Sequence, residues 1–292
     1  MNKPKGKLIP IGGSEARSSG DQEETNEGQK VNFLQNGILK QVLEEIKGTD
    51  SRMVIVPAAS EIPEEMGSLY IDAFKMLGCT KTTVVYIADR DETDKESNLK
   101  ALAEADGVLF TGGNQDALVE KLAGTKFLSI LIDRYHNEPF VVAGTSAGAA
   151  AMAKLMIKEG KSGEPLLKGM VETDLGLGLL PPVIIDTHFM QRSRLPRLTE
   201  ALLRNPSLIG MGLCQDAGVV ITEGNRLRSI GSGGIFIIET DDIVDTNYHE
   251  IDELESVYLN NLKVHVLAQG AGYIIDERRF VAAEMLAPKT DR

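Results

Sequence analysis

Short apolar runs alternate with longer amphipathic stretches through the first half of this 292-residue chain. Runs of aliphatic and β-branched residues without polar alternation are typical of strands that are buried on both faces. Between them, apolar positions recur three and four residues apart, which indicates helices. This order predicts an α/β fold in which a mostly parallel sheet is covered by helices on both faces.

The pattern places the elements of this half in a regular order. The expected strands are 8–11, 53–56, 82–87, 107–110 and 140–143, and the expected helices are 32–47, 63–77, 94–105 and one after 115. The polar, acidic stretch 14–30 is expected to form an exposed loop.

The second half becomes richer in strands. A strand at 183–185 and a helix at 195–204 precede expected strands at 219–222, 227–230, 235–239, 264–267 and 273–276. Gly224-Asn225 predicts a turn between two of them. We expect one domain, 1–292, whose C-terminal third adds antiparallel strands at one side. The acidic run 239–255 is expected to be a solvated excursion and not a metal site.

Composition narrows the class of protein. The 42% hydrophobic content supports a large core, and the formal charge of -12 argues against a nucleic-acid partner, which needs clustered cations. Cys79 and Cys214 lie far apart without metal or disulfide spacing. No run suggests a signal peptide or a membrane span, so we expect a cytoplasmic protein without a metal or other cofactor.

The segment 141–150 carries the most informative chemistry. An apolar run leads into Gly144-Thr145-Ser146-Ala147-Gly148, and a helix-prone Ala/Met/Lys segment follows. This context of buried strand, sharp turn and helix is the one that a nucleophile elbow requires. Small residues alone could also serve an ordinary strand-to-helix turn, but the context favours Ser146 as a nucleophile.

Polar residues follow three expected strands, and ligands of open α/β sheets bind beyond such carboxyl ends. Of four histidines, His188 directly follows a strand and is the preferred general base. His136 ends a helix and is expected to be exposed, His249 lies in the acidic run, and His265 alternates within a strand. None has the spacing of a metal site.

Two further groups suit the same chemistry. The N–H groups of Gly113 and Ala147 could hold an oxyanion. Arg192, Arg194 and Arg197 follow His188 at the start of a helix, where cations are mildly disfavoured. Guanidinium groups bind carboxylates through paired hydrogen bonds, so this cluster favours an acidic substrate over a merely solvated surface.

Four motifs occur together in this order: FTGGNQ (110–115), GTSAGA (144–149), DTHFMQRSRLPR (186–197) and GMGLCQDAGVV (210–220). Together they resemble cyanophycinases, in the serine peptidase family that also contains aspartyl dipeptidases. The resemblance covers the chain from about Lys7 to the C-terminal strands. It implies a three-layer α/β sandwich of the class I glutamine-amidotransferase-like (flavodoxin-like) type, with serine in place of cysteine.

The resemblance also implies roles for particular residues. Ser146 would be the nucleophile and His188 the general base. The substrate pocket would be lined by Gln115, Asp186, Arg192, Arg194 and Arg197. The implied substrate is cyanophycin, a poly-aspartate with arginine on each β-carboxylate, which is cut to β-Asp-Arg dipeptides. Asp186 would bind a guanidinium or hold those arginines, and a homodimer is implied.

Two positions depart from the family pattern. Thr187 replaces a longer polar pocket residue, and Gln215 replaces the glutamate of the catalytic triad. Asp216 is expected to be a poor substitute, because neighbouring side chains of an extended segment point to opposite faces. Gln215 leaves open an impaired relative that binds acidic or arginyl peptides. An aspartyl dipeptidase specificity on the same scaffold is a further alternative. A generic α/β-hydrolase esterase would require a late histidine such as His265.

Overall fold

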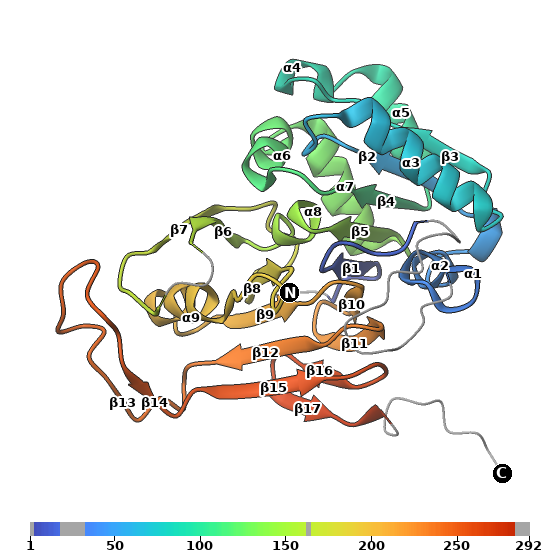
Figure 1. The fold of residues 1–292 in the computed structure, drawn as a ribbon. Coiled ribbons are helices and arrows are strands. Elements are labelled where there is room, and N and C mark those ends of the chain that lie inside the picture. The colour runs from blue at the N-terminus through green and yellow to red at the C-terminus, as the bar shows by residue number, and fades with distance from the viewer. Residues whose placement is uncertain (1–2, 18–32, 162–164, 284–292) are drawn as a thin grey trace, which may run out of the picture.

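The structure is a computed structural model that describes residues 3–17, 33–161 and 165–283. Its largest element is a nine-stranded sheet, visible through the middle of Figure 1. In spatial order the strands are β17 (Arg279–Val281), β16 (Gly272–Ile274), β11 (Arg226–Gly231), β10 (Ala217–Thr222), β1 (Lys7–Ile11), β5 (Val141–Thr145), β4 (Gly107–Phe110), β2 (Arg52–Val56) and β3 (Lys81–Val84).

The direction of these strands divides the sheet into two halves. Strands β1, β5, β4, β2 and β3 are parallel, as expected for the N-terminal half of the chain. From β1 outward, β10, β11, β16 and β17 are all joined by antiparallel pairing. The expected turn at Gly224 joins β10 to β11, and Gly224 has a φ of +64°. The sheet is therefore mixed, with the parallel strands in its N-terminal half and the expected antiparallel strands of the C-terminal third at one side.

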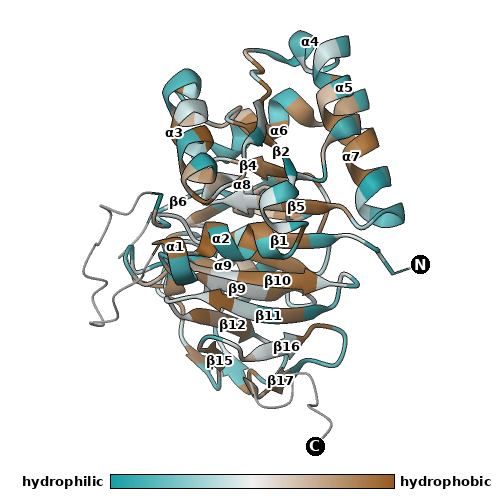
Figure 2. Ribbon diagram, turned by 90° about the vertical axis from the view of Figure 1, so that its right-hand side faces the viewer, coloured by the Kyte–Doolittle hydropathy of each residue, from teal (hydrophilic) through white to brown (hydrophobic). Residues whose placement is uncertain are grey.

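Helices cover both faces of the parallel half. Figure 2 shows α3 (Pro63–Met76) on one side and α5 (Glu96–Glu104) and α7 (Lys126–Asn137) on the other. Successive strand residues supply the two cores: Val54 packs in the cluster on the α5 and α7 side, whereas Ile55 packs in the cluster on the α3 side. Alternation along a strand thus explains why these runs are apolar throughout.

The remaining helices have at most ten residues each. They are α1 (Phe33–Asn36), α2 (Ile38–Glu44), a 3₁₀ turn (Gly48–Asp50), α4 (Arg90–Thr93), α6 (Gln115–Leu122), α8 (Ala147–Ala150) and α9 (Leu195–Arg204). The expected helix 32–47 is interrupted at Gly37, where the backbone is extended and a Cβ would lie 2.7 Å from the Phe33 carbonyl oxygen.

A second sheet was not expected. It has four strands in the order β15 (Lys263–Leu267), β12 (Ile235–Glu239), β9 (Ile209–Leu213) and β8 (Val183–Thr187). Only β8 and β9 are parallel. Residues of this sheet, including Ile184 and Met211, pack in the same core as Val54 and Phe127. The predicted strand 183–185 therefore exists, but it belongs to a different sheet from the strand that carries Ser146.

Three stretches differ from their predicted structure. The helix-prone segment after Ser146 ends at Ala150, and a hairpin of β6 (Leu155–Gly160) and β7 (Val171–Leu175) follows. A two-stranded ribbon of β13 (Asp245–Thr246) and β14 (Leu259–Asn260) lies in and after the acidic run. That run is mostly exposed, but its first residue, Glu239, is fully buried.

The predicted loop 14–30 is described only as far as residue 17, and its remainder lies outside the described residues. Within the described part the expectation of exposure is wrong for Glu15, whose side chain is buried. Among the helices that the structure describes, none has the length and apolarity needed to cross a bilayer.

Candidate active site

Ser146 lies on a strained corner between β5 and α8. Its φ of +51° is unusual for a residue with a side chain. The glycines on either side make the corner possible, because a Cβ at Gly144 would lie 2.5 Å from the Gly148 carbonyl oxygen and one at Gly148 would lie 2.4 Å from the Phe110 carbonyl oxygen. The sequence Gly-x-Ser-x-Gly therefore forms the sharp turn that its context predicted.

His188 contacts Ser146 from the other sheet. It directly follows β8, and its Nε2 lies 3.1 Å from the Ser146 Oγ. Its backbone N–H donates to the Gly12 carbonyl oxygen at 3.0 Å, so the end of β8 is fastened to the end of β1. Ser146 makes the matching bond from its N–H to the Ile11 carbonyl oxygen at 2.9 Å.

The other histidines lie elsewhere. His136 and His249 are exposed, as the sequence pattern indicated for His136. His265 is part of β15 and its Nε2 lies 3.1 Å from the buried carboxylate of Glu239, which also pairs with lysine and arginine. His265, the late histidine that an α/β-hydrolase esterase would need, thus belongs to the ion-pair network around Glu239 and does not contact Ser146.

Gly13 is a site residue that the sequence analysis missed. Its φ is +98°, and a Cβ there would lie 2.5 Å from both Cε1 and Nε2 of His188 and 3.3 Å from the Ser146 Cβ. Only glycine leaves space for the imidazole beside the serine. The available signal was a Gly-Gly pair directly after the first buried strand, at the same strand ends as Ser146.

Gln215 occupies the far side of the imidazole. Its Nε2 lies 3.1 Å from the His188 Nδ1. In this orientation the amide donates, so a neutral imidazole carries its proton on Nε2 and cannot accept one from Ser146. Rotating the amide by 180° would present its oxygen to Nδ1 and free Nε2. That oxygen accepts no hydrogen bond from the described residues, so the rotation breaks none there.

Asp216 does not replace Gln215. Its carboxylate accepts a hydrogen bond from the Ser232 Oγ at 2.6 Å. The backbone at Asp216 has a φ of +47° and is not extended, which differs from the premise of the sequence argument. The outcome is nevertheless the one expected, because the carboxylate is bound to another partner.

The electrostatic setting of His188 favours its neutral form. Burial lowers the pKa of its imidazole, and the nearby charges of Arg192 and Arg194 lower it further, against a smaller opposing effect of Asp186. The resulting pKa is about 4. The imidazole is therefore uncharged at neutral pH, as a general base must be.

A pocket of about 300 Å³ opens beside Ser146. It brings together residues from both sheets and from the β6–β7 hairpin. Its lining includes all the predicted oxyanion and substrate-binding residues, namely Gly113, Ala147, Gln115, Asp186, Arg192, Arg194 and Arg197. The predicted convergence of three strand ends is therefore present in the structure.

The family of this chain follows from its similarity to known proteins. Residues 22–230 match the sequence profile of Peptidase family S51. The chain belongs to peptidase family S51.

The similarity of this S51 peptidase to individual proteins extends over most of its length. A cyanophycinase of Synechococcus elongatus is 32% identical over 269 residues, which cover 92% of this chain and 79% of that protein. A cyanophycinase of Nostoc sp. strain PCC 7120 is 32% identical over 231 residues, 79% of this chain and 78% of that one.

A solved structure supports the fold. The crystal structure of a peptidase from an acI-B1 Actinobacterium has a TM-score of 0.62 at 17% identity, and the match covers 94% of this chain and 98% of that one. Together with the family, these similarities identify the chain as a serine-type hydrolase with an α/β fold.

Within this S51 peptidase the three arginines have different surroundings. Asp186 is only 2% exposed and accepts hydrogen bonds from Arg197 Nε at 2.7 Å and from Arg194 Nη1 at 3.0 Å. Of the two roles considered for Asp186, it thus holds the arginines. Arg192 is exposed and forms no ion pair with the described residues, so its charge remains available.

Gln115 is tied to the hairpin beside the pocket. Its Nε2 donates to the carbonyl oxygens of Ile157 and Lys158, both at 2.9 Å. These residues lie where the pairing of β6 with β7 shifts register. The amide nitrogen of Gln115 is therefore occupied, and only its oxygen could accept a bond from a substrate.

The two expected oxyanion groups are unoccupied donors. The N–H groups of Gly113 and Ala147 donate to no backbone carbonyl in the described part of the chain. Gly113 has a φ of +141°, and a Cβ there would lie 1.9 Å from the Ala59 carbonyl oxygen. Glycine is therefore required at this position, and the sequence Gly112-Gly113 correctly indicated a close backbone approach.

Proposed function

We propose that this protein is a cyanophycinase-like serine exopeptidase. It would hydrolyse cyanophycin, or related β-aspartyl peptides, to β-Asp-Arg dipeptides. The observation that carries this proposal is the 3.1 Å contact between Ser146 Oγ and His188 Nε2 beside a pocket with three guanidinium groups. The 32% identity with proteins named cyanophycinase supports the choice of substrate.

The proposed reaction uses four groups of the site. With the Gln215 amide rotated so that its oxygen accepts the Nδ1–H, Ser146 Oγ attacks the scissile carbonyl carbon while Nε2 of His188 accepts the hydroxyl proton. The N–H groups of Gly113 and Ala147 stabilise the resulting oxyanion. The imidazolium then protonates the leaving amine. In the second half of the reaction His188 takes a proton from the water that attacks the acyl-enzyme, and returns it to the Ser146 Oγ.

The charges of the pocket support an acidic substrate. The pocket lining carries three guanidinium groups and Lys158 against two carboxylates, Asp186 and Glu159, so it keeps excess positive charge. Asp186 fixes Arg194 and Arg197, while Arg192 is the cation that remains free of the described carboxylates. In this proposal Arg192 receives a substrate carboxylate, and the fixed pair adds electrostatic attraction.

A second candidate function follows from Gln215. Because its amide lies against Nδ1 and carries no charge, it stabilises an imidazolium less than a carboxylate would. The alternative is therefore an impaired relative that binds acidic or arginyl peptides without efficient turnover. An aspartyl dipeptidase would differ from both in the peptide linkage that it cuts.

A hydrolysis assay tests these candidates together. We expect the protein to release β-Asp-Arg from cyanophycin, as measured by mass spectrometry, and Ser146→Ala to release none. Matched α- and β-linked aspartyl dipeptides give the linkage specificity. Equal product from wild type and Ser146→Ala would exclude the proposed mechanism, and binding without turnover would favour the impaired relative.

Three wider expectations belong to this proposal. They are a glutamine-amidotransferase-like grouping of the fold, a homodimer and a cytoplasmic location. Light scattering of the purified protein tests the dimer directly. A mass corresponding to one 31.7 kDa chain would reject it.

A further inference from the structure

A buried carboxylate lies behind the nucleophile elbow and takes no part in the proposed reaction. Glu15 is 3% exposed and belongs to the stretch that follows β1. Burial of a carboxylate is unfavourable unless hydrogen bonds compensate. Its two oxygens have separate partners: Oε2 accepts a bond from the Thr145 Oγ1 at 2.7 Å, and Oε1 accepts one from the Tyr70 hydroxyl.

These two partners come from distant parts of the fold. Thr145 is the last residue of β5 and immediately precedes Ser146, whereas Tyr70 lies in α3. Both side chains are buried. Glu15 therefore links the strand that carries the nucleophile to a helix that packs firmly against the sheet.

The turn Gly12–Glu15 is strained, and it lies against the side chains of both Ser146 and His188. Gly13 and Ser14 both have positive φ angles, of +98° and +50°. Gly13 lies against the His188 ring, and its carbonyl oxygen accepts the Asp216 N–H at 3.1 Å. Strained backbone persists only where its surroundings hold it, and Glu15 provides a fixed end.

We infer that Glu15 is a positioning residue for the reaction of this site. By bonding Thr145 and Tyr70, it fixes the turn Gly12–Glu15 between Ser146 and His188. The turn keeps the hydroxyl and the imidazole at reacting distance. The inference rests on the proposed serine mechanism, but it assigns a role to a residue outside the nucleophile, base and substrate pocket.

Three variants distinguish the effect of the Glu15 hydrogen bonds from the effect of its negative charge. Glu15→Ala removes both bonds, and we expect it to lower kcat on the order of 10²-fold, because misplacing reacting groups by about 1 Å costs this much. KM should stay unchanged, because Glu15 does not line the pocket. Glu15→Gln has the same shape, can accept from Tyr70 and donate to Thr145, and should retain most of the activity. Thr145→Val removes one bond with little change of shape.

The test uses two measurements, and the second does not depend on the identity of the substrate. Kinetics with a β-aspartyl peptide give kcat and KM, and the rate of Ser146 labelling by a fluorophosphonate reports the serine–histidine geometry directly. Thermal unfolding identifies variants that fail to fold, in which case Thr145→Val carries the test.

The outcomes are distinct. Slow labelling by Glu15→Ala or Thr145→Val, with restoration in Glu15→Gln, supports the inference. Wild-type labelling rates in the folded variants would overturn it, as would a rise in KM at constant kcat. Wild type that is labelled but cuts no β-aspartyl peptide would reject the proposed substrate and leave the labelling test valid. Wild type that resists both would reject the proposed function itself.

Discussion

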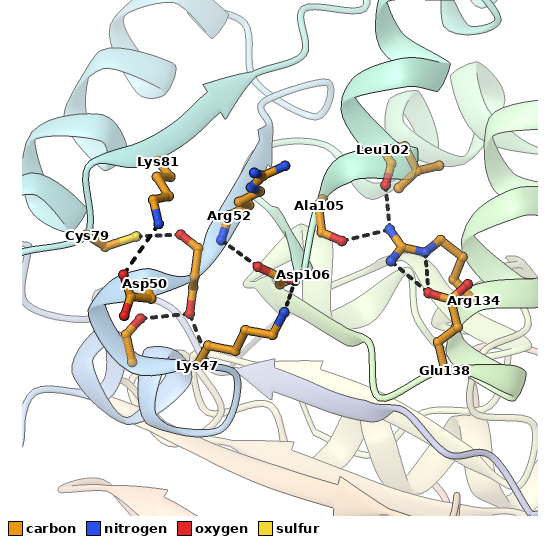
Figure 3. Close-up of polar contacts among 12 residues, drawn as sticks. Lys47, Asp50, Arg52, Cys79, Lys81, Leu102, Ala105, Asp106, Arg134 and Glu138 are labelled. Carbon is orange, nitrogen blue, oxygen red and sulfur yellow. Dashed lines mark hydrogen bonds and ion pairs between the residues drawn. The ribbon is translucent and has the colours of Figure 1, made fainter.

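The two ends of the parallel strands hold polar groups of very different character. At the amino ends, shown in Figure 3, Asp106 accepts hydrogen bonds from Lys47 Nζ at 2.7 Å and from the Arg52 N–H at 2.9 Å. Arg134 donates to two carbonyl oxygens and to Glu138. At the carboxyl ends, Arg192 has no ion-pair partner among the described residues, and His188 is held uncharged.

The backbone differs in the same way. Directly before β2 and β3 the positive φ angles belong to glycines, Gly48 and Gly78, and near the start of β1 Glu223 has a φ of +56° within the β10–β11 hairpin turn. At the carboxyl ends they include Ser14, Ser146 and His188. Strain of this kind costs stability and is concentrated where function requires it. One end of the strands therefore stabilises the fold, whereas the other uses that stability to hold reactive geometry.

The largest expected effect comes from adding charge beside the imidazole. Gln215→Glu should raise kcat by about 10³-fold, because the converse change in trypsin, aspartate to asparagine, costs about 10⁴-fold. The carboxylate would accept a hydrogen bond from the Nδ1–H and stabilise the imidazolium. Steady-state kinetics on a β-aspartyl peptide measure the change.

A neighbouring glutamine provides the control for charge alone. Gln191 contacts the Gln215 N–H through its Oε1 at 3.3 Å, so Gln191→Glu adds a carboxylate nearby without reaching Nδ1. We expect no comparable gain. If Gln215→Glu leaves kcat unchanged, the native glutamine already suffices and the impaired candidate loses its support.

The second effect tests the space beside the imidazole. Gly13→Ala places a methyl group 2.5 Å from Nε2 and should lower kcat on the order of 10²-fold or more by displacing the ring. Gly48→Ala is the matched control, since Gly48 also has a positive φ but a Cβ there meets nothing within 4 Å. Equal activity of the two variants would mean that a methyl group at Gly13 does not displace the imidazole.

The third effect is a pH dependence. Because His188 must be neutral to accept a proton and its pKa is lowered to about 4 by burial and by the nearby arginines, kcat/KM should stay constant near neutral pH. It should fall as the pH drops through that value. Arg192→Gln removes one of the lowering charges, so the acid limb should move to higher pH. An acid limb near the ordinary histidine pKa in wild type would contradict this electrostatic account.

The smallest effect concerns the amino ends. Partial burial raises the pKa of Asp106, but the bonds from Lys47 and Arg52 outweigh it and hold that pKa below its ordinary value. Asp106→Asn should therefore lower the free energy of unfolding by about 1 kcal/mol at neutral pH, since the Lys47 end is exposed. The difference should vanish as the pH falls through the lowered pKa. Urea unfolding measures it, and kcat should not change.

Local signals made the elbow and the base predictable. Gly144 and Gly148 flank Ser146 because the turn excludes side chains, and that requirement is visible in the sequence. His188 was found because strand ends collect ligands. The second sheet was not predictable, because an apolar run such as 183–185 reveals that it is buried but not which strands it pairs with.

The missed features depend on distant partners. The burial of Glu15 depends on Tyr70 and Thr145, which lie 55 and 130 positions away. In the sequence it belongs to a polar stretch, so it was assigned to an exposed loop. Similarly, sequence spacing could not reveal that Asp186 is saturated by Arg194 and Arg197 while Arg192 remains free.

The nucleophile and the base reach each other across a junction of two sheets, which a shared core and the bond from the His188 N–H to the Gly12 carbonyl oxygen hold together. The rate of catalysis therefore depends on the correct docking of the two sheets. A mild denaturant concentration that separates the second sheet from the first would abolish activity, while the circular dichroism signal of the secondary structure stays unchanged. Inactivation ahead of the spectroscopic transition would show that this docking is lost before the sheets unfold.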